Sequence, residues 1–184
     1  MKECYTREEL IRSVASGEQV EYLFFWGHTE KDQLTKACFS QWYPAEFEVD
    51  GVAYKTAEHY MMAGKARLFE DREMLEKILL ASSPIEAKKL GRAVKNFDPE
   101  KWNKKGFEIV VEASVAKFSQ DPALKEFLLN TGDKVLVEAA PRDRIWGIGL
   151  GQNNEKAQNP ETWRGRNLFG FALMKARSII REQN

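Results

Sequence analysis

The segment AYKTAEHYMMAGKARLF, residues 53–69, has the spacing of a helix but carries charge on its most regular face. Four of its residues follow i, i+3, i+4, i+7 spacing and so share one side of a helix: Glu58, Met61, Met62 and Lys65. A carboxylate and an amine two turns apart, with two thioethers between them, form either the floor of a pocket or the solvated edge of a helix. The spacing alone favours the solvated edge, so the remaining sequence has to decide between the two.

The composition predicts one soluble domain. The 184 residues include 28 Lys plus Arg and 28 Asp plus Glu. This length favours a single domain, and the zero net charge argues against a polybasic nucleic-acid-binding module, although a local basic groove is compatible with it. Cys4 and Cys38 lack CxxC spacing, so we expect free thiols rather than a disulfide framework or a cysteine zinc site. Because there is no signal-peptide core and no run of about 18 apolar residues, we expect a cytoplasmic protein with no membrane partner.

Pairs of a capping residue and a proline mark several helix starts. Such a pair occurs four times: Ser83-Pro84, Asp98-Pro99, Asp121-Pro122 and Asn159-Pro160. The capping side chain accepts from free backbone amides, and proline at the first helical position gives up no hydrogen bond. The helix after Pro84 is predicted to end at Gly91, and a final helix is predicted from about Leu168. Most of the protein should therefore be helical.

Strand signals are fewer than helix signals. The sequence AEFEVDGVAYKT alternates and contains Asp50-Gly51, which predicts a hairpin. Two other short segments, residues 20–26 and 134–139, are further β candidates. The expected fold class is therefore α+β: a single mainly helical domain with a small antiparallel β element.

After residue 139 the sequence becomes rich in glycine, tryptophan and polar residues. Loops of this composition often wrap a ligand, because glycine permits close backbone approach and tryptophan offers a stacking face. The run GIGLG does not match GxGxxG, so a flexible loop is an equal alternative. Asp143 and Trp146 precede this run and also have structural alternatives. Asp143 could form a salt bridge with Arg142 or Arg144, and Trp146 could fill the core.

Two other candidates have structural alternatives. Trp102, near the start of a long helix, is more often a core anchor than a stacking platform. His59 is more often a packed, hydrogen-bonded histidine than a metal ligand. His28 and His59 are the two histidines of the chain, and neither HxxxH nor HExxH occurs, so we expect no metal site.

Four segments together resemble the NADAR family, also called YbiA-like: FEVDGVAYKTAEHYMMAGKARLF, SSPIEAKKLGR, KFSQDPALKEFLLNTGDKVLVEAAPRDRIWGIG and RGRNLFGFALMKAR. The shared motifs are [ST]-x-E-H-Y with a later lysine, an acidic residue before W-G-x-G, and G-x-N-x-x-G before the last helix. The resemblance covers about residues 24–180. It implies a NADAR domain at residues 21–182, preceded by an N-terminal extension or short helix at residues 1–20.

The resemblance implies an N-glycosidase that uses neither a metal nor a redox cofactor. Family members are associated with a phosphoribosylamino-pyrimidine intermediate of early riboflavin synthesis, and with ADP-ribose attached to guanine in nucleic acid. The expected partner is a small phosphoribosyl or ADP-ribosyl substrate, with ADP-ribosylated nucleic acid as an alternative. The neutral net charge favours the small metabolite, because binding of a phosphate backbone usually recruits a basic surface. The alternative from a different class is a non-catalytic ADP-ribose- or nucleotide-binding module, which would bind without releasing a sugar.

The matching motif positions also imply the residues of the site. The implied catalytic residues are Glu58, Lys65 and Asp143. The implied substrate-binding residues are Trp102, Trp146, Gly147, Gly149, Asn167 and His59. Ile148 stands where some relatives carry an acidic residue, and residues 151–163 are longer than in compact members, so the substrate choice stays open.

The chemistry of the reaction agrees with these residue types. Breaking an N-glycosidic bond develops positive charge at the anomeric carbon and requires a proton on nitrogen, and two carboxyl groups meet both demands. A lysine in a dry pocket would alternatively attack an opened ribosylamine and form a Schiff base. Four side chains are therefore predicted to converge on one pocket: Glu58, Lys65, Trp102 and Asp143.

Overall fold

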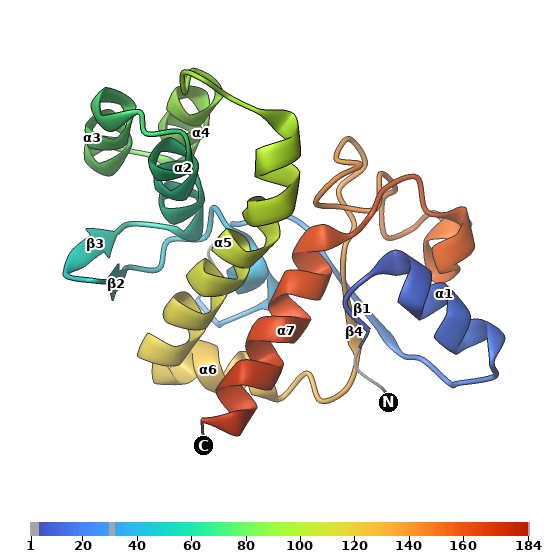
Figure 1. Ribbon diagram of the computed structural model, residues 1–184. Coiled ribbons are helices and arrows are strands. Elements are labelled where there is room, and N and C mark those ends of the chain that lie inside the picture. The colour runs from blue at the N-terminus through green and yellow to red at the C-terminus, as the bar shows by residue number, and fades with distance from the viewer. Residues whose placement is uncertain (1–3, 30–31, 184) are drawn as a thin grey trace.

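Helices dominate the computed structural model, which describes residues 4–29 and 32–183 (Figure 1). The α-helices are α1 (Arg7–Ala15), α2 (Ala57–Leu68), α3 (Arg72–Leu80), α4 (Pro84–Arg92), α5 (Pro99–Gln120), α6 (Pro122–Leu129) and α7 (Leu168–Glu182). The strands are β1 (Tyr22–Phe25), β2 (Phe47–Val49), β3 (Val52–Tyr54) and β4 (Val135–Glu138), and the 3-10 helices are η1 (Lys36–Phe39), η2 (Glu155–Gln158) and η3 (Pro160–Thr162). Residues 1–3 of the expected N-terminal extension lie outside the described residues.

The strands form two small sheets. β2 and β3 make the predicted antiparallel hairpin, and its turn residues Asp50 and Gly51 have φ angles of 52° and 76°. Positive φ at both positions is typical of the turn that best matches the twist of a hairpin. β1 and β4 pair in parallel, with Phe25 opposite Glu138. The sequence indicated both of these strands but not their pairing, because a parallel pair requires a long crossover and most of the chain lies between them.

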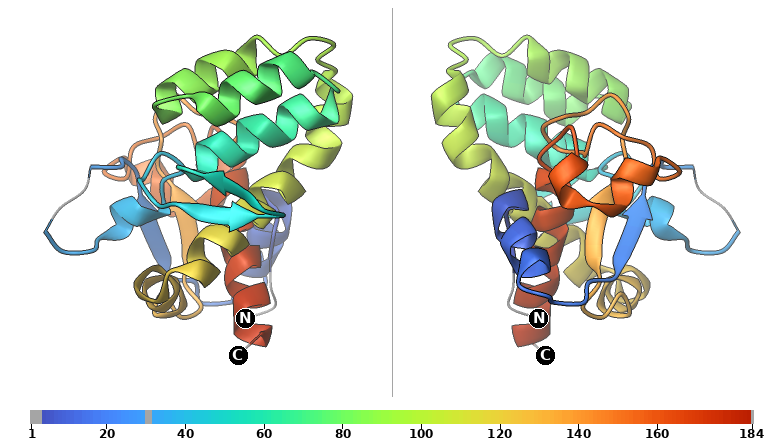
Figure 2. Two further views of the ribbon diagram at one scale, coloured as in Figure 1. Left: turned by 90° about the vertical axis from the view of Figure 1, so that its left-hand side faces the viewer. Right: turned by 90° about the vertical axis from the view of Figure 1, so that its right-hand side faces the viewer.

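Helices α5 and α7 pack against each other through the middle of the molecule (Figure 1). On one side, α2 packs against α3, α4 and α5. On the other side, β4 packs against α7 and pairs with β1. The segment between β4 and α7 lies beside the parallel strands in the right-hand view of Figure 2. The start of α2 and the end of β4 are nevertheless close enough for the charges of Glu58 and Glu138 to act on each other.

Three of the four capped prolines begin an α-helix, and the fourth, Pro160, begins the short η3. The predicted helix end at Gly91 is wrong, because α4 continues to Arg92. Gly91 is buried, and a Cβ at this position would overlap the Met62 sulfur. This glycine therefore lets α4 pack closely on α2, and does not end the helix.

Helix α2 is enclosed along most of its length. Thr56 caps it by accepting a hydrogen bond from the His59 amide, and buried residues follow from Ala57 to Ala63 without interruption. Glu58 is only 5% exposed, whereas Lys65, two turns later, is half-buried. The solvated-edge interpretation of Glu58 is therefore wrong.

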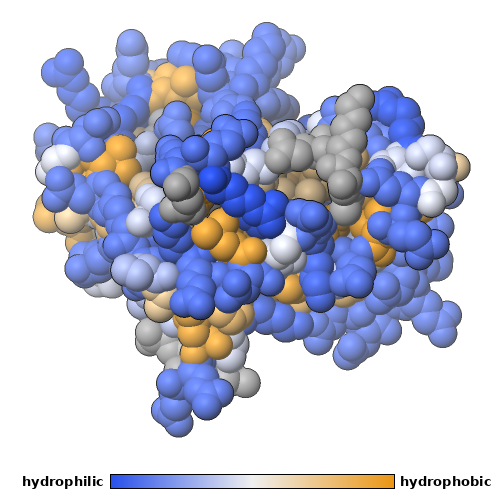
Figure 3. Space-filling view, turned by 90° about the horizontal axis from the view of Figure 1, so that it is seen from below, coloured by the Kyte–Doolittle hydropathy of each residue, from blue (hydrophilic) through white to orange (hydrophobic). Residues whose placement is uncertain are grey.

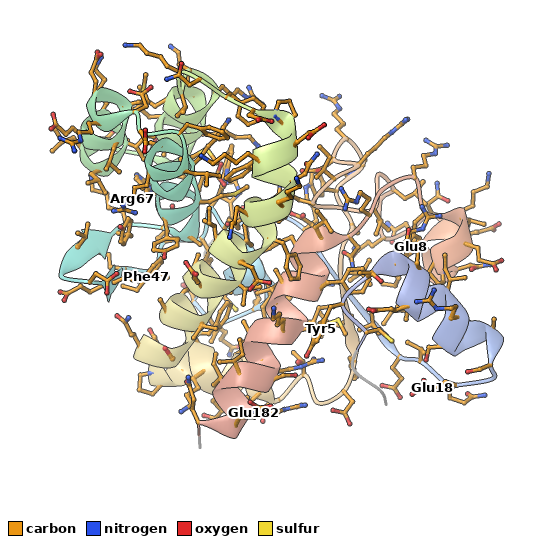
Figure 4. The ribbon with its side chains drawn as sticks, in the orientation of Figure 1. Tyr5, Glu8, Glu18, Phe47, Arg67 and Glu182 are labelled. Atoms are coloured by element: carbon orange, nitrogen blue, oxygen red, sulfur yellow. The ribbon has the colours of Figure 1, made fainter. Side chains whose placement is uncertain are left out.

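The outer surface is mostly hydrophilic, with scattered hydrophobic patches in the view from below (Figure 3). Phe47 of the hairpin and Arg67 of α2 lie on the same side of the molecule (Figure 4). There the Arg67 guanidinium donates to the Tyr54 hydroxyl at 2.6 Å and ties α2 to β3. In the described part of the chain, no helix combines the length and apolar character needed to cross a bilayer.

Candidate active site

Glu58 lies in the first turn of α2 and is buried beneath residues of two other segments. Its amide donates to the Gln41 carbonyl at 3.0 Å, which fixes the residues before the hairpin against α2. Burial raises the pKa of the Glu58 carboxyl to about 7. The positive charge of Lys88, a hydrogen bond from the Trp42 side chain and the charge of Arg92 oppose this rise in pKa, and the charge of Asp143 adds to it. Glu58 therefore changes protonation near neutral pH, as an acid–base catalyst must.

Asp143 lies in the loop after β4, close enough to Glu58 for its charge to affect the pKa of that residue. One of its carboxylate oxygens, Oδ1, accepts from the amides of Ile145 at 2.9 Å and Trp146 at 2.8 Å. This turn fixes the carboxylate of Asp143 at the start of the WGxG segment. Its negative charge raises the pKa of both Glu58 and Glu138, so these three carboxyl groups act on one another electrostatically.

Glu138 is one of the residues of this region that the sequence did not predict. It is the last residue of β4, and its Oε2 is buried without a hydrogen-bond partner among the described residues. Burial raises its pKa to about 8; the charges of Asp143 and Glu58 add to the rise, and the charge of Lys88 opposes it. A buried carboxyl oxygen without a partner is costly for folding, which makes Glu138 a candidate functional residue. The available signal was a single acidic residue that ends the apolar run VLVE and lies near Asp143.

Two basic residues of α4 and an aromatic side chain complete the surroundings of the carboxyl groups. Lys88 acts on both Glu58 and Glu138, and Arg92, one turn further along α4, acts on Glu58. The Lys88 ammonium lies 5.4 Å from the Trp42 ring centroid. In the sequence, KKLGR had no feature that distinguished it from the solvated face of a helix, so these cations were not predicted.

The charge of Arg92 affects the pKa of both Lys65 and Glu58. Burial lowers the pKa of the Lys65 amine, and the positive charge of Arg92 lowers it further. The ammonium lies 4.3 Å from the centroid of Phe97 and 5.8 Å from that of Trp102. Met62 packs toward Gly91 instead, so aromatic rings, rather than the two methionines, form the apolar surroundings of the amine.

The two predicted tryptophans lie at different edges of this region. Trp102 is partly buried against the core and close to Lys65, and a Cβ on Gly106 would lie 3.0 Å from its ring. Trp146 is also partly buried against the core, and its amide donates to Asp143. Both arrangements are compatible with a core anchor that leaves one ring edge for a ligand, so the stacking role stays a prediction.

Two predicted substrate-binding residues have their polar atoms in use within the protein. The buried Asn167 amide donates to the Leu136 carbonyl and accepts from the Glu138 amide, both at 2.9 Å. The buried His59 ring bonds to the Thr56 hydroxyl at 2.8 Å and the Ala81 carbonyl at 3.1 Å. The contact of these side chains with substrate stays a prediction, and the bonds shown are internal to the protein. Asn167 holds β4, and through it Glu138, while His59 fixes the start of α2.

Gly147 and Gly149 also serve packing between protein segments. A Cβ on Gly147 would lie 3.0 Å from the Glu138 carbonyl oxygen. Gly149 has φ of 67°, and a Cβ there would lie 3.0 Å from the Cβ of Arg164. At both glycines the backbone comes close to other parts of the protein, and the approach of this backbone to substrate stays a prediction.

The carboxyl groups do not form a metal-binding cluster. Within residues 4–29 and 32–183, no group of three or more His, Cys, Asp or Glu side chains is arranged so that it could hold a metal ion. The carboxyl groups instead interact with two cations, Lys88 and Arg92. Carboxyl groups of this kind can transfer protons, and the cations can bind an anionic substrate.

The model of the NADAR domain matches residues 24–181. The chain belongs to the NADAR family. This NADAR protein is 47% identical over 174 residues to N-glycosidase R617 of Acanthamoeba polyphaga mimivirus, which covers 91% of this chain and 98% of that protein. It is 34% identical over 138 residues to Riboflavin biosynthesis protein PYRR, chloroplastic, of Zea mays, which covers 71% of this chain and 20% of that protein.

The solved structure of YbiA from E. coli has the same fold. It matches with a TM-score of 0.72 at 28% identity, over 90% of this chain and 88% of that chain. Together with the relatives named as N-glycosidases, this match identifies the NADAR protein as an N-glycosidase, a hydrolase acting on N-glycosyl compounds. The alternative of a non-catalytic nucleotide-binding module is not favoured.

Proposed function

We propose that this NADAR protein hydrolyses the bond between the anomeric carbon of a ribose and the exocyclic nitrogen of a heterocyclic base. The observation that carries this proposal is the buried group of carboxyls, in which Glu58 has a pKa of about 7 and Glu138 a pKa of about 8. Hydrolysis of a glycosidic bond needs one carboxyl that donates a proton and another that accepts one, and a pair with separated pKa values supplies both.

The roles follow from the charges. Glu138, with the higher pKa, donates its proton to the leaving nitrogen as the bond from carbon to nitrogen breaks. Glu58, once ionised, takes a proton from the water whose oxygen bonds to the anomeric carbon. The Asp143 carboxylate stabilises the positive charge that develops on the sugar, and the cations Lys88 and Arg92 bind a substrate phosphate.

Lys65 supports a covalent variant of the same reaction. In an opened ribosylamine, the Lys65 amine attacks the imine carbon and expels the base as an amine; water then hydrolyses the Schiff base and releases the sugar and the free lysine. The lowered pKa of Lys65 supports this route, because a larger fraction of the amine is then unprotonated.

We expect borohydride added during turnover to leave a sugar-derived mass on Lys65, and Lys65→Arg to abolish both the adduct and turnover. Peptide mapping by mass spectrometry detects the adduct. Normal turnover by Lys65→Arg would reduce Lys65 to a charged binding group.

The proposed substrate is a phosphoribosylamino-pyrimidine, with ADP-ribose on guanine as the second candidate. The maize relative is named as a riboflavin biosynthesis protein, and the formal net charge of zero favours a small phosphorylated metabolite over a nucleic-acid chain. The basic groups near the carboxyls, Lys88 and Arg92, match the charge of a phosphate in either substrate.

The test is to incubate the protein separately with the phosphoribosylamino-pyrimidine and with ADP-ribosylated guanosine, and to follow the released sugar by chromatography. We expect Glu138→Gln to reduce turnover by at least about 100-fold without unfolding the protein. The matched control is Glu126→Gln, which changes an exposed glutamate of α6 and should leave turnover unchanged. Failure to release a sugar from either substrate, or normal turnover by Glu138→Gln, would overturn the proposal.

A further inference from the structure

A hollow opens at the ends of the parallel strands. It has a volume of about 540 Å³ and is lined by Trp26, Lys36, Ala139, Pro141 and the turn at residues 151–154. This volume is within the range of small-molecule sites, about 300–1,000 Å³. Ala139 directly follows Glu138, and Pro141 lies two residues before Asp143. Two lining residues are therefore within two positions of a candidate carboxyl in the sequence.

Trp26 supplies the aromatic surface of this hollow. It follows β1 directly and is 67% exposed, which is unusual for the largest side chain. Its backbone neighbour Phe25 accepts from the Ala139 amide at 2.9 Å, so the strand pairing fixes the position of Trp26 relative to the end of β4. An exposed tryptophan in a hollow is a surface on which a flat ring can stack.

Lys36 and the turn at residues 151–154 form the polar wall. The Lys36 ammonium donates to the Phe24 carbonyl at 2.7 Å and to the Gln152 side-chain oxygen at 3.3 Å. The turn is closed by a hydrogen bond from the Asn154 amide to the Gly151 carbonyl at 3.0 Å. Because the oxygen of the Gln152 amide accepts from Lys36, the nitrogen of the same amide is the side that can donate to a ligand.

We propose that this hollow is a substrate subsite for a flat nucleobase, which stacks on Trp26 while Gln152 and its neighbouring amides bind the polar edge of the ring. The inference rests on the proposed function, since the lining residues Ala139 and Pro141 lie within two positions of Glu138 and Asp143 in the chain. The ring is either the leaving base itself or a second base at the far end of a longer substrate.

The test measures binding and turnover in Trp26→Ala and Trp26→Phe. Calorimetry with AMP and with ribose 5-phosphate is done in the Glu58→Gln background, so that binding is measured independently of turnover. We expect Trp26→Ala to weaken AMP binding by about 5- to 150-fold and Trp26→Phe to retain part of it, with ribose 5-phosphate unaffected. The control Leu80→Ala removes another exposed apolar side chain, 81% exposed and at the end of α3, and should change neither ligand.

Turnover of the two substrates in the Glu58-containing protein identifies the source of the ring. An increase in KM for both substrates on Trp26→Ala places the leaving base on Trp26; an increase for ADP-ribosylated guanosine alone places the distal adenine there. Unchanged AMP binding in Trp26→Ala, or an equal loss for ribose 5-phosphate, would overturn the subsite. Trp26-dependent AMP binding in a protein that cleaves neither substrate would leave the subsite standing and reject the proposed reaction.

Discussion

The face of α2 and the glycine-rich loop before α7 both resembled substrate-contacting segments, but the structure uses them differently. On α2, Glu58 and Lys65 present titratable groups, and burial shifts the pKa of each toward neutrality. In the loop, the side-chain amide of Asn167 forms hydrogen bonds to β4, and the backbone at Gly147 packs closely against the end of β4. In the proposed reaction the face of α2 supplies acid–base groups, whereas Asn167 of the loop holds Glu138 in place. Motif residues of equal regularity can therefore serve different purposes.

The largest expected effect is a loss of turnover, and it tests the role of Glu58 on α2. Glu58→Gln keeps the shape of the side chain and removes its acid–base function, so turnover should fall by at least about 100-fold while the protein stays folded. Activity is measured as sugar release, and folding as the thermal midpoint by circular dichroism. If the midpoint falls sharply while activity per folded molecule stays normal, Glu58 is a structural residue and the contrast between the two segments is lost.

The supporting role of the loop is tested by Asn167→Ala. This change leaves the Glu138 amide and the Leu136 carbonyl without their partners, and should lower the free energy of unfolding by about 2–5 kcal/mol. Urea unfolding measures the loss, and Asn103→Ala, on the exposed face of α5, is the matched control. Unchanged stability together with a raised KM would instead support Asn167 as a substrate contact.

The pH dependence tests whether Glu58 and Glu138 act together. Activity needs Glu58 ionised and Glu138 protonated, so kcat/KM should peak between about pH 7 and 8 and fall about tenfold per pH unit beyond each side. Glu138→Gln should remove the fall on the alkaline side. A profile that is flat across this range in the unchanged protein would separate these carboxyls from the rate-limiting chemistry.

Stability should follow the same two groups. Both pKa values are raised above the ordinary value of 4.5, so ionisation is less favourable in the folded state than in the unfolded chain. Folding is therefore most favoured by these groups at low pH, and the free energy of unfolding should decrease as pH rises from about 4.5 to 8. Glu58→Gln and Glu138→Gln should each flatten this dependence in urea titrations at several pH values.

The smallest expected effect on substrate binding concerns Trp102, whose ring either stacks on the substrate or packs in the core. If its ring stacks on the substrate, Trp102→Ala should weaken binding by about 1–3 kcal/mol, with Trp102→Phe retaining part of the affinity. If it is a core anchor, Trp102→Ala should instead cost about 3–5 kcal/mol of stability with no effect specific to substrate. Parallel measurement of substrate affinity and urea unfolding separates the two outcomes.

Local signals in the sequence predicted much of the fold, because caps and turns depend on neighbouring residues. Asp50-Gly51 and Asp98-Pro99 are such signals, and the hairpin and α5 start where they indicate. The prediction at Gly91 was wrong, because a glycine that ends a helix cannot be distinguished in sequence from one that allows a neighbouring helix to pack closely.

The site was predictable only where a family motif marked it. Glu138 ends an ordinary apolar strand, and its burial beside Asp143 depends on pairing with a strand near the other end of the chain. Lys88 lies on a helix with other basic residues, and only the packing of α4 on α2 turns it toward Glu58. Both residues act through long-range contacts that local patterns do not encode.

The parallel pairing of β1 with β4 also has a consequence for synthesis of the protein on the ribosome. Phe25 emerges early, but its strand partner Glu138 is translated only after most of the helices. Closing so long a loop costs chain entropy that the later contacts must offset. A nascent chain that has folded α2 through α5 therefore still lacks Glu138 and Asp143, so the candidate active site is completed only when these later residues leave the ribosome.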